Sequence, residues 1–195
     1  MQTIRVVVVG TIRTRKVLTH KLSIMNLKKY EQNLTSPLRQ ATITLLLREN
    51  EVLLAMKKRG FGIGKWNGVG GKPNPGEDII ACAIRESEEE IGVTPIDPKK
   101  VAVFNFYFPL VPAEKNWGQQ VSVFTATKWQ GIPIETEEMN PKWFKLKDVP
   151  FKEMWWDDEI WMPKVFAGAL LRGSFMFGKD EKLDDYYINE VLSFG

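Results

Sequence analysis

The sequence has only one cysteine, Cys82, and one histidine, His20, among its 195 residues. A single cysteine excludes an intrachain disulfide, which suits a reducing compartment, and His20 lies too near the N-terminus for us to expect histidine-based acid–base catalysis. No run approaches the roughly 18 consecutive apolar residues of a membrane span, and the early apolar run 6–9 is too short for a signal-peptide core. We therefore expect a cytoplasmic protein without a membrane partner.

Acidic residues are nearly missing from the first 40 residues, which hold eight Lys or Arg and, as their only acid, Glu31. Residues 41–195 hold 19 basic and 23 acidic side chains, a net charge of −4. Nucleic acids bind to positively charged surfaces. The mildly acidic remainder of the chain therefore argues against a stable nucleic-acid partner.

The basic segment 1–40 lacks sustained hydrophobic periodicity and ends in the turn-forming stretch 33–37. We predict that residues 1–40 are a poorly ordered N-terminal extension and that residues 41–195 form one domain, which is long enough to bury a core. Two other interpretations stay open. The Arg-rich, acid-poor composition is also typical of organelle targeting, and the segment could be translated sequence upstream of the true start.

From residue 41 onward, strand-like and helix-like patterns are mixed without strict alternation. Glycine is dense between Gly60 and Gly76, which predicts loops and close backbone approach. The predicted elements are a β-hairpin at 41–47 and 51–56, a helix at 77–91 ended by Gly92, strands at 101–108, 121–127 and 142–146, a helix from 158 to 171 ended by Gly173, and strands at 174–178 and 183–191. This order predicts an α/β fold with a mixed β-sheet.

The helix predicted over 77–91 concentrates acidic side chains. Glu86, Glu89 and Glu90 are spaced i, i+3 and i+4, so their carboxylates share one face. Such a run on its own is usually a solvated face. The alternative is a divalent cation, and hard carboxylate ligands suit Mg²⁺ or Mn²⁺. Cys82 lies between two alanines on this helix, and we predict that it is buried and inert.

A longer pattern, G-x5-E-x7-R-E-S-E-E-E-I-G-V, extends over the 23 residues from Gly71 to Val93. It resembles the signature of the Nudix hydrolases, G-x5-E-x7-R-E-U-x-E-E-x-G-U, in which U is a bulky aliphatic residue. Every fixed position matches, and Ser87 departs from the aliphatic preference. The resemblance implies an α/β/α sandwich and metal-dependent hydrolysis of a phosphoanhydride bond.

The resemblance also assigns roles. Glu86, Glu89 and Glu90 would bind the metal, Mg²⁺ or Mn²⁺, together with the carbonyl of Gly70. One of the glutamates would be the general base, and the family leaves open which. Arg85 would complete the catalytic set by orienting a glutamate, which we expect to be Glu77.

Rarer motifs narrow the resemblance to the branch of this family that hydrolyses oxidised purine nucleoside triphosphates. They occur at 57–62, 65–72, 137–139, 142–144 and 150–158. The implied substrate-binding residues are Thr42, Lys57, Phe61, Asn67, Val69, Gly70, Gly71, Lys72, Trp155, Trp156, Asp157 and Asp158, and Glu138 would be a further metal ligand. Trp156 stands where the branch has proline, which predicts a bulkier pocket rim.

The pair Asp157 and Asp158 has a physical interpretation beside the resemblance. Two adjacent carboxyl groups cannot both ionise comfortably if they are buried among tryptophans. One would keep its proton and could donate a hydrogen bond to a purine. In isolation, an Asp-Asp pair before a helix is more often an N-cap with first-turn charge.

The resemblance implies an enzyme that converts 8-oxo-dGTP or 2-hydroxy-dATP to the monophosphate and pyrophosphate and so sanitises the nucleotide pool, and we expect a monomer. Rival substrates for the same chemistry are ADP-ribose, a dinucleotide and a pteridine triphosphate. Rivals of another class are a nucleotide-binding sensor and an RNA-end-processing factor recruited by the basic segment. The complete glutamate set argues against the sensor.

Overall fold

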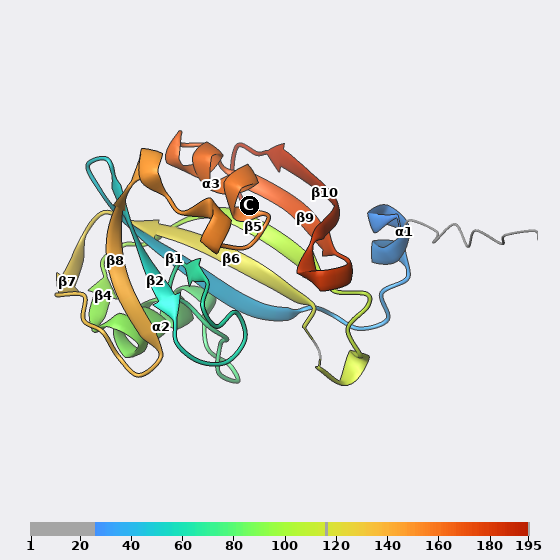
Figure 1. Ribbon diagram of the computed structural model, residues 1–195, viewed down its shortest axis with the longest axis horizontal. Coiled ribbons are helices and arrows are strands. Elements are labelled where there is room, and N and C mark those ends of the chain that lie inside the picture. Colours follow the sequence, from blue (N-terminus) through green and yellow to red (C-terminus); the bar gives the residue numbers. More distant parts are fainter. Residues whose placement is uncertain (1–25, 116, 195) are drawn as a thin grey trace, which may run out of the picture.

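The computed structural model describes residues 26–115 and 117–194, which fold around one large sheet (Figure 1). The strands are β1 Arg39–Arg48, β2 Glu51–Lys57, β3 Trp66–Asn67, β4 Val93–Pro95, β5 Lys99–Tyr107, β6 Gln119–Ala126, β7 Trp129–Gly131, β8 Met139–Lys145, β9 Leu171–Phe177 and β10 Leu183–Glu190. The α-helices are α1 Leu27–Gln32, α2 Ile79–Ile91 and α3 Asp158–Phe166. Four short 3-10 helices, η1 Ala113–Lys115, η2 Leu146–Asp148, η3 Phe151–Glu153 and η4 Lys179–Glu181, lie in connections.

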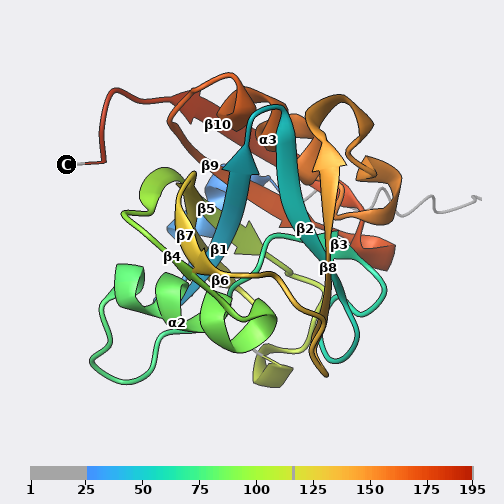
Figure 2. The ribbon, with the colours of Figure 1, turned by 90° about the vertical axis from the view of Figure 1, so that its left-hand side faces the viewer.

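The sheet is mixed, as predicted. Its strand order is β10-β9-β5-β6-β1-β2-β3, and β8 pairs with β2. The pairs β1–β6 and β5–β9 are parallel, and the other pairs are antiparallel. Strands β4 and β7 form a separate two-stranded sheet beside α2 (Figure 2).

Helices α2 and α3 cover opposite faces of the sheet (Figure 1). Successive side chains of a strand point to opposite faces of the sheet, so each strand contributes to the core on both faces. Leu45 of β1 belongs to the core cluster that contains Trp161 of α3. Its neighbour Leu46 belongs to the cluster that contains Ile91 of α2. The predicted α/β architecture with helices on both faces is confirmed.

Helix α2 begins and ends where the sequence predicts to within two residues. The Asp78 side chain caps it by accepting hydrogen bonds from the N–H groups of Ile80 and Ala81. Gly92 ends it in the left-handed conformation, at φ 71°. Cys82, which the sequence predicts to be buried, is buried, whereas Ile80 near the start of the helix is 42% exposed.

Helix α3 is shorter than predicted. It ends at Phe166, and the chain turns at Gly168, which has φ 90°. Strand β9 already starts at Leu171. Gly173, predicted to end the helix, lies inside β9, where a Cβ atom would meet the backbone of Tyr187 in β10. This glycine serves strand pairing rather than helix termination.

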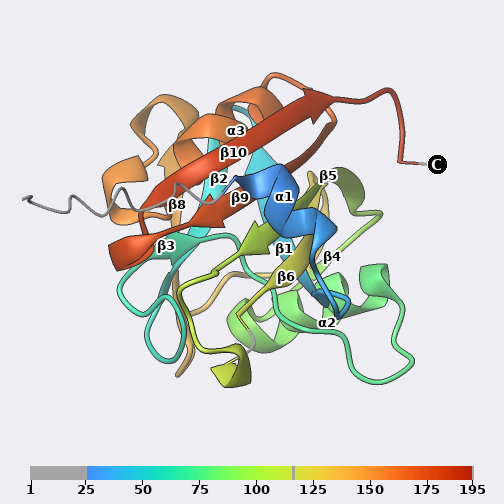
Figure 3. The same ribbon diagram turned by 90° about the vertical axis from the view of Figure 1, so that its right-hand side faces the viewer.

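The predicted extension 1–40 differs from the structure at its C-terminal end. Helix α1 packs on the sheet beside β9 (Figure 3), and Leu27 is buried with Tyr107 and Met176. Strand β1 begins at Arg39, so the boundary predicted at residue 40 falls inside a strand. Local periodicity missed this helix because six residues carry too little pattern and tertiary packing holds it in place.

Residues 1–25, on which the predicted disorder and organelle targeting chiefly depend, lie outside the described residues. Within residues 26–115 and 117–194, no helix combines the length and the apolar character needed to cross a membrane.

Candidate active site

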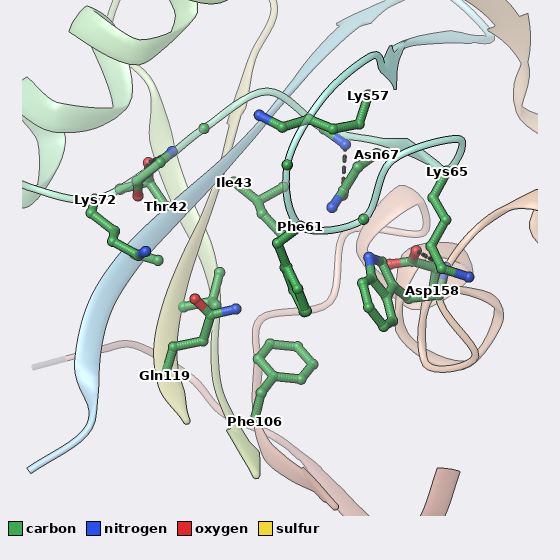
Figure 4. Close-up of a pocket in the computed structure, with 18 of the residues that line it drawn as sticks. Thr42, Ile43, Lys57, Phe61, Lys65, Asn67, Lys72, Phe106, Gln119 and Asp158 are labelled. Carbon is green, nitrogen blue, oxygen red and sulfur yellow. Dashed lines mark hydrogen bonds between the residues drawn. The ribbon is translucent and has the colours of Figure 1, made fainter. Parts of the chain in front are cut away.

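A cavity of about 480 Å³ opens between β1, the glycine-rich loop and the segment before α3. Its size is typical of small-molecule sites. Figure 4 shows Phe61 projecting into its middle, with Lys65 and Asp158 on one side and Thr42, Lys72 and Gln119 on the other. Most predicted substrate-binding residues line it: Thr42, Lys57, Phe61, Asn67, Gly70, Gly71, Lys72, Trp155, Asp157 and Asp158.

Two predicted residues do not line this cavity. The Val69 side chain is buried in the core cluster on the α2 face, and only its backbone joins the site, through hydrogen bonds with Thr44. Trp156 is 51% exposed and lies outside the cavity wall. The Val69 side chain cannot reach a ligand because it is buried in the core, and the Trp156 side chain cannot because it faces solvent.

The loop after β3 lies directly against β1. The Thr42 N–H donates to the Gly71 carbonyl at 2.8 Å. Gly70 has φ 155°, and a Cβ atom there would meet the Thr42 carbonyl. A Cβ atom at Gly71 would meet the carboxylate of Glu86. Glycine at these positions therefore lets the loop pass between the strand and the carboxylates of α2.

Glu90 joins α2 to both β2 and the glycine-rich loop. Its side chain is only 4% exposed, and it accepts hydrogen bonds from Lys57 Nζ at 3.0 Å and from the Gly70 N–H at 2.8 Å. Burial raises the pKa of the Glu90 carboxyl, and the positive charge of Lys57 opposes that shift. These contacts hold the carboxylate in a fixed direction.

Arg85 contacts three glutamates. It donates to both carboxylate oxygens of Glu77, at 2.7 and 2.8 Å, and to Glu86 and Glu89 at 3.0 and 2.9 Å. The hydrogen bonds that Arg85 donates to Glu77 lower the pKa of Glu77 to about 2 and raise the pKa of Arg85. The structure brings Arg85 and Glu77 together as the resemblance implies.

The acidic residues expected to bind metal share a second concave surface. It is lined by Glu86, Glu89, Glu90 and Glu138, with Arg59, Thr136 and Glu137. Cations occupy these carboxylates: Arg59 contacts Glu138 at 2.6 Å, and Lys57 and Arg85 contact the others. Within the described part of the chain, no three His, Cys, Asp or Glu side chains converge as an assembled metal cage.

The donor chemistry at this surface nevertheless fits a divalent cation. Carboxylate oxygens are the ligands that hard cations prefer. The space left by Gly71 accommodates the Glu86 carboxylate. A bound cation would exchange places with Arg and Lys contacts at the same oxygens.

At the other end of the cavity, aromatic rings surround a buried pair of acids. Phe61 stacks on Trp155 with ring centroids 5.0 Å apart. Asp157 and Asp158 are 3% and 2% exposed. Asp157 accepts from Trp161 Nε1 and Asp158 from the Trp155 N–H, each at 3.0 Å.

Burial raises the pKa of both aspartates, and the charge of Asp157 raises that of Asp158 further. Asp157 occupies the N-cap position of α3, but its side chain makes no capping hydrogen bond. The pair therefore does not act as an ordinary helix cap. Burial therefore favours the neutral form of these carboxyl groups beside the cavity.

Sequence reasoning missed several cavity residues. Phe106 and Phe108 alternate along the strand predicted at 101–108, a signal that could have placed both on one face. Lys65 lies over the Trp155 ring at 4.9 Å, and Trp117 contacts Phe61 edge-on at 4.7 Å. Gln119 also lines the wall. Lys65 lies in a motif of the resemblance and Trp117 and Gln119 in a segment expected along the pocket wall, but the sequence assigns a role to none of the three, because strand pairing and loop packing decide their contacts.

Comparison with known proteins identifies the family. The family model described as the NUDIX domain matches residues 37–165. The chain is 40% identical over 153 residues to the oxidized purine nucleoside triphosphate hydrolase of Mus musculus, covering 78% of this chain and 96% of that protein. It is 38% identical to the protein of the same name from Danio rerio, covering 77% and 94%.

Among solved structures, the mutator MutT protein from Bacillus halodurans superposes with a TM-score of 0.67 at 28% identity, covering 78% of this chain and 98% of that one. Family members generally use divalent metals, in agreement with the donor set on α2. On the strength of the matched domain, the glutamate helix and the shared fold, the chain belongs to the Nudix hydrolase family.

Proposed function

We propose that this enzyme hydrolyses oxidised purine (deoxy)nucleoside triphosphates of the 8-oxo-dGTP and 2-hydroxy-dATP type. Water would attack the phosphate chain so that the bond between the α- and β-phosphates breaks. The products would be the nucleoside monophosphate and pyrophosphate. The chain's similarity to two proteins named oxidized purine nucleoside triphosphate hydrolase supports this substrate class.

The observation that carries the proposal is the continuity of one cavity. Its aromatic end offers Trp155 and the buried acids Asp157 and Asp158 to a flat base, and its other boundary is the loop that contacts Glu86 and Glu90. A stacked base gains on the order of 1–3 kcal/mol. A substrate that spans this cavity would carry a purine at one end and phosphates at the other.

The acid pair supplies a means of choosing the base. A neutral carboxyl donates a hydrogen bond, and an ionised one only accepts. Two adjacent acids that share one proton present a donor beside an acceptor. Moving the proton between Asp157 and Asp158 exchanges these positions, which would let one pocket take purines oxidised at different atoms. Asn67 adds both a donor and an acceptor at the same end.

Glu86, Glu89, Glu90, Glu138 and the Gly70 carbonyl would hold Mg²⁺, or Mn²⁺ in its place. The bound cation would neutralise phosphate charge and lower the pKa of a water molecule. Lys57 and the Gly70 N–H fix the direction of Glu90, and Arg85 fixes Glu86 and Glu89. One of these glutamates would accept the proton of the attacking water.

The deciding experiment is kcat/KM for 8-oxo-dGTP against dGTP in the presence of Mg²⁺, with products separated by chromatography. We expect 8-oxo-dGTP to be preferred and to yield pyrophosphate. ADP-ribose, a dinucleotide and a pteridine triphosphate belong in the same panel. Equal or faster turnover of ADP-ribose would overturn the proposed substrate.

A further inference from the structure

A basic corner lies at the end of the cavity away from the acid pair. Lys72 and Gln119 line the cavity there, on the side opposite Lys65 and Asp158 (Figure 4). Arg39, the first residue of β1, is the register partner of Gln119 across the β1–β6 pair. The roles proposed above leave Arg39 and Gln119 without a function.

The register places Arg39 on the cavity side of the sheet. Gln40, the next residue, belongs to the opposite face, where its amide donates to Gln120 at 3.3 Å. Ala41, two residues after Arg39, lines the cavity. Because side chains alternate along a strand, Arg39 shares the face of Ala41 and Gln119 and continues the wall outward.

Arg39 also has an unsatisfied donor. Its Nε atom is buried and has no hydrogen-bond partner. Buried polar groups are normally paired, so such an atom calls for a ligand or another explanation. Among the ion pairs of residues 26–115 and 117–194, none includes Arg39 or Lys72.

The two cations lie close enough to influence one another. Burial lowers the pKa of Lys72, the Arg39 charge lowers it further, and the Glu86 charge acts in the opposite direction. Lys72, which lines the cavity, is therefore near both Arg39 and Glu86 of α2. Two like charges that lie close together, neither of them in an ion pair within the described residues, form a site that an anion stabilises.

We propose that Arg39 and Lys72, with the Gln119 amide as a neutral donor, bind the two substrate phosphates that leave as pyrophosphate. This inference rests on the proposed function, since it takes the base at the Asp158 end and bond cleavage beside α2. The planar guanidinium can donate two parallel hydrogen bonds to phosphate oxygens, and the Lys72 ammonium adds a point charge.

The test uses inorganic pyrophosphate as an inhibitor of the full-length protein. In Arg39→Gln, the inhibition constant for pyrophosphate should rise roughly 10- to 100-fold, the effect of losing a charge-assisted hydrogen bond. Inhibition by the nucleoside 8-oxo-deoxyguanosine should not change, because that ligand has no phosphate. The matched control is Arg172→Gln, which removes an exposed arginine whose side chain donates to the Phe194 carbonyl. It should leave both constants unchanged.

Equal pyrophosphate inhibition of the wild type and Arg39→Gln would overturn the inference. A parallel loss of nucleoside affinity would also overturn it, because the variant would then have disturbed the whole cavity. If Arg39→Gln folds poorly by circular dichroism, Lys72→Gln decides by the same comparison.

The outcome separates this inference from the proposed function. A wild type that binds pyrophosphate through Arg39 but does not turn over 8-oxo-dGTP would contradict only the substrate. A wild type that turns over 8-oxo-dGTP, with pyrophosphate inhibition indifferent to Arg39 and Lys72, would contradict only the phosphate site.

Discussion

Two groups of carboxylates in this molecule have opposite surroundings. On α2, Glu86 and Glu89 contact Arg85, and Glu90 contacts Lys57. At the start of α3, Asp157 and Asp158 are buried and accept hydrogen bonds only from a tryptophan side chain and a backbone N–H. No ion pair within residues 26–115 and 117–194 includes them. The first group has cationic partners, and in the second group burial raises the pKa of both carboxyl groups.

The difference shows that environment decides what an acidic residue can do. A carboxylate paired with Arg or Lys side chains has the oxygen ligands that a divalent cation would need in their place. A carboxyl that burial keeps neutral can donate a hydrogen bond, which an anion cannot do. The two groups lie on separate surfaces, the aspartates at the aromatic end of the cavity and the glutamates on the concave surface of α2, so each can be altered without the other.

The largest effect should follow from removing charge on the helix. We expect Glu89→Gln with Glu90→Gln to lower the rate of pyrophosphate release by roughly 10³-fold, because the cation loses two ligands. The fold should survive, as judged by circular dichroism, since glutamine keeps the shape of glutamate. Glu88→Gln, an exposed change on the same helix, is the control. Undiminished turnover by the double variant would mean that these carboxylates hold no catalytic metal.

A smaller effect is expected at the acid pair. Asp157→Asn and Asp158→Asn, made separately, should each lower kcat/KM for 8-oxo-dGTP by roughly 10- to 100-fold, the effect of one hydrogen bond with a charged or neutral acid. The rate with a poor substrate such as dGTP should fall less. Steady-state kinetics with both nucleotides test this. If neither variant alters either value, the pair has no part in base recognition.

The acid pair should also set a pH dependence of stability. The pKa of each aspartate is raised on folding, so between pH 5 and 7 the folded state binds more protons than the unfolded state, and the free energy of unfolding falls as pH rises. The slope should reach about 1.4 kcal/mol per pH unit for one full proton. Glu77, with its lowered pKa, acts in the opposite direction and only below this window.

Urea unfolding at pH 5, 6 and 7 measures that slope. The double variant Asp157→Asn with Asp158→Asn has no titrating group at these two positions. Its free energy of unfolding should therefore change less with pH than that of the wild type. Identical slopes in the two proteins would show that the pair ionises normally and that the contrast with α2 is only one of position.

The glutamates of α2 could be predicted from the sequence better than the aspartate pair beside the cavity. Asp78 and Gly92 mark the ends of α2 locally, and the spacing of Glu86, Glu89 and Glu90 follows directly from helix geometry. The acid pair could be named from the resemblance. The burial of the pair depends on packing against Trp161, and the Asp157 side chain bonds to Trp161 instead of capping the helix. No local sequence pattern contains this information.

Residues that reach the cavity from distant strands could not be found in this way. Gln119 is the partner of Arg39 because β1 and β6 pair in parallel across 80 residues, and a slip of one residue in that register would put the two side chains on opposite faces. Helix α1 could not be predicted either, because its stability comes from tertiary contacts with the sheet on which it packs. Its six residues show no periodicity of their own.

The smallest effect concerns a third carboxylate, Glu31 of α1, whose partners are neutral hydroxyl groups. Ser174 donates to it at 2.6 Å and Tyr107 and Tyr187 at 3.2 Å. Glu31→Gln should lower the free energy of unfolding by about 1–2 kcal/mol, because charge-assisted bonds become neutral ones. Thermal or urea unfolding measures this, with Gln32→Ala on the exposed side of α1 as the control.

Turnover of 8-oxo-dGTP should not change in Glu31→Gln, since Tyr107 and Ser174 alternate with the cavity-lining Phe106, Phe108 and Phe177 and so belong to the other face of the sheet. Full stability in this variant would mean that the hydroxyl groups gain nothing from a charge. A loss of kcat/KM with stability intact would mean that α1 acts on the cavity through the sheet. Either result would contradict the idea that each carboxylate serves one purpose. The contacts of a carboxylate would then no longer tell whether it serves metal binding, base recognition or folding.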